Sequence, residues 1–196
     1  EQGLEAMRAA LDILRSRSRL SADAIATLQK HGRVILVYDP NYPERQMISY
    51  TVAAFFPKYF NERGDFLVRV GRHGIKWPPA ELGAVLAHEL AGHGMQRLRG
   101  GAEKMRPLDR ECEAWLYEEQ AYQDLGVNKS IKRMVEFRKQ LEGRECSDFK
   151  RYQAEEEPRT LKLWEARNPN VPRLLALFRS YAKGAATESL LPGRQG

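Results

Sequence analysis

The sequence has few of the features that build disulfide scaffolds, thiolate zinc sites or membrane spans. It contains two cysteines among 196 residues, Cys112 and Cys146, so a disulfide-rich scaffold is excluded. No Cys-x-x-Cys pair is present, which excludes a zinc site built on paired thiolates. We expect both cysteines to be free and buried, and a single disulfide between them is the alternative. No apolar run approaches the roughly 18 residues that a membrane helix needs, so we expect no membrane span in this segment.

The composition is that of a folded chain with a charged, well-hydrated surface. Charged residues make up 30% of the chain, and 3 Trp, 8 Tyr and 7 Phe are too many aromatic residues for an intrinsically disordered protein. The net charge of +6 permits an anionic partner. The basic positions between Lys132 and Arg144 lack an aromatic platform that would stack on bases. We therefore interpret them as a solvated helix face and do not expect a nucleic-acid partner.

The first residue of the sequence leaves the compartment open. Because the chain begins at Glu1 rather than at methionine, we expect a processed product or an excised segment. The compartment is therefore unknown, and we consider a cytoplasmic location or, if an upstream signal has been removed, the cell envelope or secretion. The oligomeric state is also left open.

The order of the predicted elements is typical of a single α+β domain that spans residues 1–196. Its first part, about 1–77, contains a small sheet of three strands or more. Apolar spacing predicts helices within 4–30, with Ser21 as the N-cap of the second one. Runs of β-branched and aromatic residues between turn residues predict strands at 34–38, 48–56 and 66–70.

The second part, about 78–190, is predicted to be mostly helical. A helix at 79–99 begins at a proline, which suits the first helical position, and ends before two glycines. Further helices are predicted at 108–125 and 129–142. Two or three more are predicted within 148–184, with interruptions at prolines 158, 169 and 172.

The residues that bind metals best are concentrated in the helix predicted at 79–99. Two of the four histidines, His88 and His93, lie in the segment AHELAGHG at 87–94. Neutral imidazoles are good zinc ligands, and a catalytic zinc site uses three protein ligands and keeps a fourth position for water. Bound zinc lowers the pKa of that water to about 7. Glu89 directly follows the first histidine, where a general base would accept the proton of that water.

This segment resembles the signature of the zincin metallopeptidases, His-Glu-x-x-His on an active-site helix. The order of a small sheet, the active-site helix and a following helix is also similar, over roughly residues 33–125. No histidine follows His93 at the distance of the metzincin extension, so the resemblance favours the gluzincin branch, whose third ligand is acidic. It implies a zincin-like fold, one Zn²⁺ per chain, Glu89 as catalytic base and a protein or peptide substrate.

The sequence departs from that signature by one extra residue between Glu89 and His93. On a regular helix, positions i and i+4 differ by about 40° in direction, whereas i and i+5 differ by about 140°. A regular helix would therefore point His88 and His93 apart. We predict that a one-residue π-bulge absorbs the extra residue, and the alternative is a helix break at Gly92.

The third ligand is expected on the helix predicted at 108–125, which offers Glu111 and Glu113. These two glutamates lie about 200° apart around a helix, so only one can face the metal. The Glu111 side is smaller and more apolar, which suits packing against the active-site helix. The pair Glu111 and Ala114 is also similar to the Glu-x-x-Ala pattern of several gluzincin families. We favour Glu111 as the ligand, with Glu113 as the alternative.

Three functional hypotheses follow from these residues. The first is zinc-dependent peptide hydrolysis, in which His88, His93 and Glu111 hold the metal and Glu89 activates the water. The second is a degenerate zincin that acts as a metal-binding interaction or regulatory module without proteolysis. The third is a basic nucleic-acid-binding domain in which the histidine pattern is accidental. In the first hypothesis, the strand at 66–70 is either the sheet edge that pairs with an extended peptide or an ordinary core strand.

Overall fold

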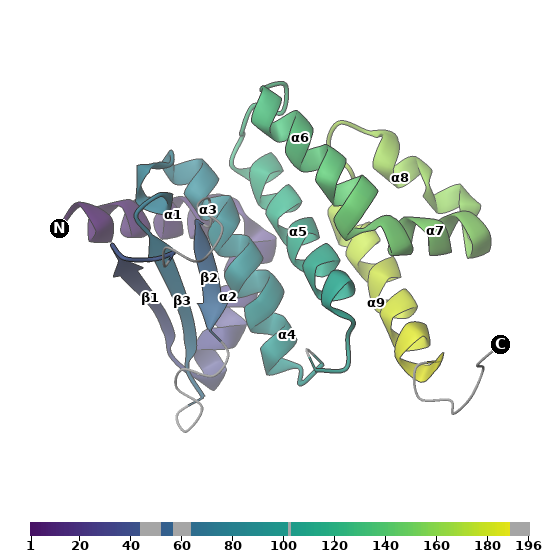
Figure 1. Ribbon diagram of the computed structural model, residues 1–196, viewed down its shortest axis with the longest axis horizontal. Coiled ribbons are helices and arrows are strands. Elements are labelled where there is room, and N and C mark those ends of the chain that lie inside the picture. The colour runs from purple at the N-terminus through teal and green to yellow at the C-terminus, as the bar shows by residue number, and fades with distance from the viewer. Residues whose placement is uncertain (44–51, 57–63, 102, 189–196) are drawn as a thin grey trace.

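The computed structural model describes residues 1–43, 52–56, 64–101 and 103–188. They form a mostly helical α+β structure with one small mixed sheet, which confirms the predicted class (Figure 1). The sheet and the first two helices lie at one end of the molecule, and helices α6 to α9 lie at the other (Figure 1). Within the described ranges, no helix is both long enough and apolar enough to cross a membrane.

Two helices, α1 (Gln2–Arg17) and α2 (Arg19–His31), open the chain. α1 buries Met7, Ala10 and Leu14, whose spacing of three and four places them on one face. The chain turns at Ser18, which has extended dihedrals and donates a 2.7 Å hydrogen bond from its hydroxyl to Asp124. The prediction that Ser21 caps α2 was therefore wrong, because the turn lies three residues earlier and Ser21 is buried inside the helix.

The sheet has three strands in the spatial order β1 (Val34–Asp39), β3 (Phe66–Gly71) and β2 (Ala53–Phe56). β1 runs parallel to β3, and β2 runs antiparallel to it. The predicted strands at 34–38 and 66–70 are confirmed. The third is confirmed at 53–56, and its predicted start at 48–51 lies outside the described residues.

The central strand is β3, which has a neighbour on each side. Its backbone groups are used in both pairings, so β3 cannot add an extended peptide, and the interpretation of residues 66–70 as a sheet edge was wrong. Its side chains are almost all buried, as expected of a core strand. The edge strand that lies against the helix with both histidines, called here the histidine helix, is β2.

The histidine helix consists of α3 (Pro79–Ala87), the π-helical segment η2 (His88–Gly94) and α4 (Met95–Leu98). This continuous run confirms the helix predicted at 79–99. It fully buries Leu82, Leu86 and Leu90, and it lies between the sheet with α1 on one side and α5 (Pro107–Asp124) on the other (Figure 1). Nearly all residues of the helix from 81 to 94 are buried, so its position is determined on several sides by packing.

The remaining helices complete the far end of the molecule. They are α6 (Lys132–Gln140), the π-helical segment η3 (Leu141–Glu145), α7 (Ser147–Glu156), the short 3-10 turn η4 (Pro158–Thr160), α8 (Lys162–Glu165) and α9 (Val171–Glu188). Another 3-10 turn, η1 (Gly74–Lys76), lies at the sheet end, between β3 and α3. The helix predicted at 129–142 begins later, at Lys132. Before it, the Asn128 side chain accepts a hydrogen bond from the Ser130 amide and forms a turn. Pro172 does not interrupt a helix, since it lies in the first turn of α9, where proline is tolerated.

Cys112 of α5 and Cys146, which follows η3, form a disulfide. The expectation of free thiols was therefore wrong, and the alternative of one bridge is confirmed. Folding brings the two Cα atoms within 4.7 Å across a separation of 34 residues, and both residues are fully buried. The bridge joins the helix that contains Glu111 to the helical layer behind it.

The disulfide is expected to contribute substantially to stability. A loop of this length corresponds to about 3–4 kcal/mol in the loop-entropy estimate. We expect the variant Cys112→Ser/Cys146→Ser to lose about that much free energy of unfolding, measured by urea denaturation. Wild-type protein denatured under reducing conditions is the control and should show the same loss. Equal unfolding midpoints for the variant and the oxidised wild type would contradict the expectation.

Candidate metal centre

The segment that contains both histidines is π-helical. In η2 the Met95 amide donates to the Leu90 carbonyl, a hydrogen bond from i+5 to i. The helix then continues through α4, so the predicted bulge is confirmed and the alternative of a break at Gly92 does not occur. The wider turn absorbs the extra residue and brings His88 and His93 to the same side of the helix.

Gly92 contributes to this geometry through its missing side chain. Among the described glycines, only Gly64, Gly100 and Gly126 have positive φ, so Gly92 is not needed for an unusual dihedral. A Cβ atom built on Gly92 would lie 2.6 Å from the Cβ of Ala114 on α5. The glycine therefore allows α5 to pack closely against the π-helical segment.

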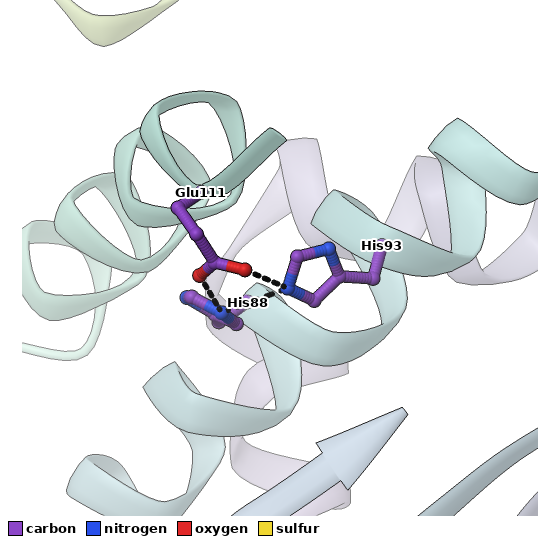
Figure 2. Close-up of side chains that lie close together, drawn as sticks. All are labelled: His88, His93 and Glu111. Carbon is purple, nitrogen blue, oxygen red and sulfur yellow. Dashed lines mark hydrogen bonds and ion pairs between the residues drawn. The ribbon is translucent and has the colours of Figure 1, made fainter. Parts of the chain in front are cut away.

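The two histidines converge with Glu111 (Figure 2). His88 Nε2 lies 3.1 Å from His93 Nε2 and 3.5 Å from Glu111 Oε2. His93 Nε2 lies 3.4 Å from Glu111 Oε1. Ligands at 2.0–2.1 Å from a tetrahedral zinc ion are separated by about 3.3 Å. The three side chains thus offer ligand types that zinc prefers, and they lie close enough together that they could hold one metal ion.

The cluster borders a cleft of about 620 Å³. The side chains of His88 and His93 are 11% and 19% exposed, whereas that of Glu111 is 43% exposed. The rest of the lining combines apolar and charged side chains, among them Val52, Ala53, Leu108, Trp115 and Glu145. One side of the three-residue cluster is therefore accessible to a small molecule or a peptide.

The alternative ligand, Glu113, lies elsewhere. Its side chain is buried, accepts a 2.8 Å hydrogen bond from Arg99, and lies 3.1 Å from the Gln96 amide nitrogen. The structure thus brings Glu111 rather than Glu113 to the histidines, as the comparison of the two helix faces predicted.

Each histidine has a partner at its second ring nitrogen. His88 Nδ1 lies 3.0 Å from Glu118 Oε2, an ion-pair contact that lacks hydrogen-bond geometry, and Glu118 Oε1 accepts a 2.9 Å hydrogen bond from the Tyr122 hydroxyl. His93 Nδ1 lies 3.0 Å from the side-chain oxygen of Gln96. Both Nε2 atoms are therefore directed to the cluster, which is the arrangement that metal-binding histidines commonly show.

Glu89 lines the same cleft but does not belong to the three-residue cluster. Its Oε2 accepts a 2.8 Å hydrogen bond from the Phe55 amide of β2. The Gly71 amide donates to the Val52 carbonyl, so the alternation of an antiparallel ladder turns the Phe55 amide away from β3 and toward the histidine helix. The edge strand thereby holds one oxygen of the carboxylate in place.

The ionisable groups of the site shift one another's pKa values. Burial raises the pKa of Glu89 to about 7. Burial, together with the nearby charge of His88, lowers the pKa of His93 to about 4. Burial alone would lower the pKa of His88 and raise that of Glu111. Their mutual contact, with Glu118 beside His88, outweighs this, so the His88 pKa lies well above its ordinary value and the Glu111 pKa lies below it.

The comparisons with known proteins do not add to this picture. Neither a protein-family model, nor a curated protein, nor a solved structure matches the chain. The assignment of the site therefore depends on its geometry and chemistry.

Sequence reasoning did not assign roles to Glu118, Gln96 or the Phe55 amide. Glu118 lies two turns after Glu111 on α5, and Gln96 lies one turn after His93, so helical spacing is the signal that could have indicated both. The Phe55 amide has no such signal, because its direction depends on the register between β2 and β3.

The packing at Gly92 can be tested by a substitution. We expect Gly92→Ala to destabilise the metal-free protein by about 1–3 kcal/mol, because the added methyl group would collide with Ala114. Urea denaturation measures this change. Gly143→Ala, in the other π-helical segment, is the matched control, because a Cβ atom there meets nothing within 4 Å. Equal stability of the two variants would show that the close contact between Gly92 and α5 does not restrict the size of the residue at position 92.

The perturbed pKa values predict proton release when zinc binds at pH 7. His88 has a raised pKa, so it must lose its extra proton before it can coordinate a metal. Glu89 has a pKa of about 7, so it is partly protonated at this pH and releases that proton when a cation is bound nearby. His93 and Glu111 are already deprotonated at this pH. We expect about one to two protons per zinc, measured by titration calorimetry in buffers of different ionisation enthalpy. Heats that do not depend on the buffer would contradict this.

Proposed function

We propose that this protein is a zinc-dependent metallopeptidase of the zincin type. The observation that supports the proposal is the convergence of His88 Nε2, His93 Nε2 and the Glu111 carboxylate at the spacing of zinc ligands. Glu89 lines the same cleft and follows the first ligand in sequence. A zinc ion bound there would polarise a carbonyl group and lower the pKa of a coordinated water.

The chain's own residues divide the remaining work. Glu89 is the proton acceptor and donor, and a pKa near 7 suits both roles. The Phe55 amide holds its Oε2, which leaves Oε1 for proton transfer. Glu118 and Gln96 orient the two imidazole rings.

The proposed substrate is a protein or peptide segment in extended conformation. By the same ladder alternation, the backbone groups of Ala53 and the carbonyl of Phe55 point away from β3, at the edge that lies along the histidine helix, while the Phe55 amide is already used by Glu89. An extended chain that pairs there would lie beside the metal ligands. Ala53 also lines the cleft, which links this edge to the proposed site.

The disulfide favours one of the two compartments left open by the sequence. Disulfides form and persist in oxidising surroundings such as the cell envelope or the extracellular space. We therefore propose that the protein functions in an oxidising compartment, after export.

The proposal is tested by separating metal binding from hydrolysis. We expect wild-type protein to bind one Zn²⁺ and to cleave an unfolded protein substrate. Glu89→Gln should keep the zinc and lose at least about 100-fold in cleavage rate, because it removes the proton acceptor. Metal analysis and a fluorescent casein assay measure the two effects.

Variants of the three proposed ligands test metal binding itself. His88→Ala/His93→Ala should lose zinc, and Glu111→Gln should bind it more weakly. Stoichiometric zinc in the double histidine variant would refute the site.

Two observations favour a second function. The Phe55 amide already occupies one oxygen of Glu89, and the π-helical insertion changes the usual relation between base and ligands. A protein that binds zinc without cleaving would use the site as a metal-binding interaction module. Wild-type protein with full zinc and no measurable hydrolysis would favour this alternative.

A further inference from the structure

Gln96 connects one proposed metal ligand to a buried ion pair. It lies on α4, one helical turn after His93, and is 1% exposed. Its Oε1 lies 3.0 Å from His93 Nδ1. Its Nε2 donates to the Arg110 carbonyl at 2.8 Å and to Glu113 at 3.1 Å, and Glu113 in turn accepts from Arg99 at 2.8 Å.

These contacts determine which end of the Gln96 amide faces His93. An amide side chain has one oxygen that accepts and one nitrogen that donates two hydrogens. The Arg110 carbonyl can only accept hydrogen bonds. The Glu113 carboxylate, which is paired with Arg99, also acts only as an acceptor. The amide nitrogen must therefore face them, which directs the oxygen to His93.

The same logic determines the tautomer of the imidazole. Since Gln96 Oε1 can only accept, His93 Nδ1 must carry the hydrogen. In the neutral ring, Nε2 then keeps its lone pair, and this atom lies 3.1 Å from His88 Nε2 and 3.4 Å from Glu111. The lone pair is thus placed where a metal ion would accept it.

We propose that Gln96 is a positioning residue that locks His93 in the metal-binding tautomer, and that the Arg99–Glu113 pair holds Gln96 in its orientation. The inference deepens the proposed function, because it rests on His93 as a metal ligand. It also explains why Glu113, the rival ligand candidate, is buried beside the site without joining the cluster.

The two ligands are held by different chemistry. His88 Nδ1 faces the carboxylate of Glu118, whereas His93 Nδ1 faces a neutral amide. A carboxylate partner increases the basicity of an imidazole, and an amide orients the ring with a smaller electronic effect. His93 is therefore the ligand whose contribution depends mainly on orientation.

The decisive experiment compares two buried glutamines. Gln96→Leu removes the lock, and Gln153→Leu is the matched control. Gln153 is also 1% exposed and hydrogen-bonded on both sides, but it lies on α7 and contacts Trp164 and Thr160. We expect Gln96→Leu to weaken Zn²⁺ affinity about 10- to 100-fold in a chelator competition and to change the visible spectrum of bound Co²⁺. Gln153→Leu should change stability alone, leaving affinity and spectrum as in wild type.

A conservative substitution tests the support of Gln96. Glu113→Gln retains one oxygen that can accept from Gln96, and the Arg110 carbonyl remains the second acceptor for Gln96, so the zinc affinity should lie near the wild-type value. Glu113→Leu should weaken zinc affinity, but less than Gln96→Leu does, because Gln96 and its contact with Arg110 remain. Equal zinc affinity in Gln96→Leu and wild type would overturn the positioning role.

The tautomer of His93 can also be measured directly, by imidazole ¹⁵N nuclear magnetic resonance of the metal-free wild-type protein. This measurement needs no variant that could misfold, and it does not depend on the proposed function. We expect His93 to carry its hydrogen on Nδ1. A hydrogen on Nε2 instead would overturn the tautomer lock, even if zinc binds. Failure of wild-type protein to bind zinc, with the Nδ1 tautomer intact, would refute the metal site and leave the lock as a property of the fold.

Discussion

The close packing of the π-helical segment against α5 is the constraint on which the site depends. The extra residue at 88–93 would separate the histidines on a regular helix, and the wider turn removes that separation. The wider turn is useful only if α5 comes close enough to supply Glu111. Gly92 and Ala114 make this approach possible, because neither has a side chain beyond Cβ in the contact.

The site also concentrates charge in a buried region, and its pairings explain how the fold tolerates this. Burying an unpaired carboxylate costs several kcal/mol, so each buried acid needs a cation or hydrogen-bond donors. Glu113 contacts Arg99, and Glu118 contacts both His88 and Tyr122. Glu89 has the Phe55 amide and a raised pKa. The acids nearest the cluster therefore have direct partners, and these contacts also fix the surroundings of His88, His93 and Glu89.

The helix that supplies Glu111 is braced from behind. The Cys112–Cys146 disulfide follows Glu111 directly in sequence and ties α5 to the end of η3. Glu145 precedes Cys146 and lines the cleft, so the bridge also helps to define the far wall of the site. The helices beyond α5 thus contribute to the geometry of the cleft.

The sequence by itself determined the elements whose signals are local. Helical apolar spacing, a proline start and paired glycines were enough to predict the histidine helix. Helix angles predicted its bulge, and the smaller, more apolar face together with the Glu-x-x-Ala resemblance favoured Glu111. The tertiary structure decided what depends on contacts distant in sequence. These are the pairing of Cys112 with Cys146, the central place of β3, the direction of the Phe55 amide and the orientation of the Gln96 side chain. None of these has a periodic signature, because each depends on which surfaces meet when the helices and the sheet pack together.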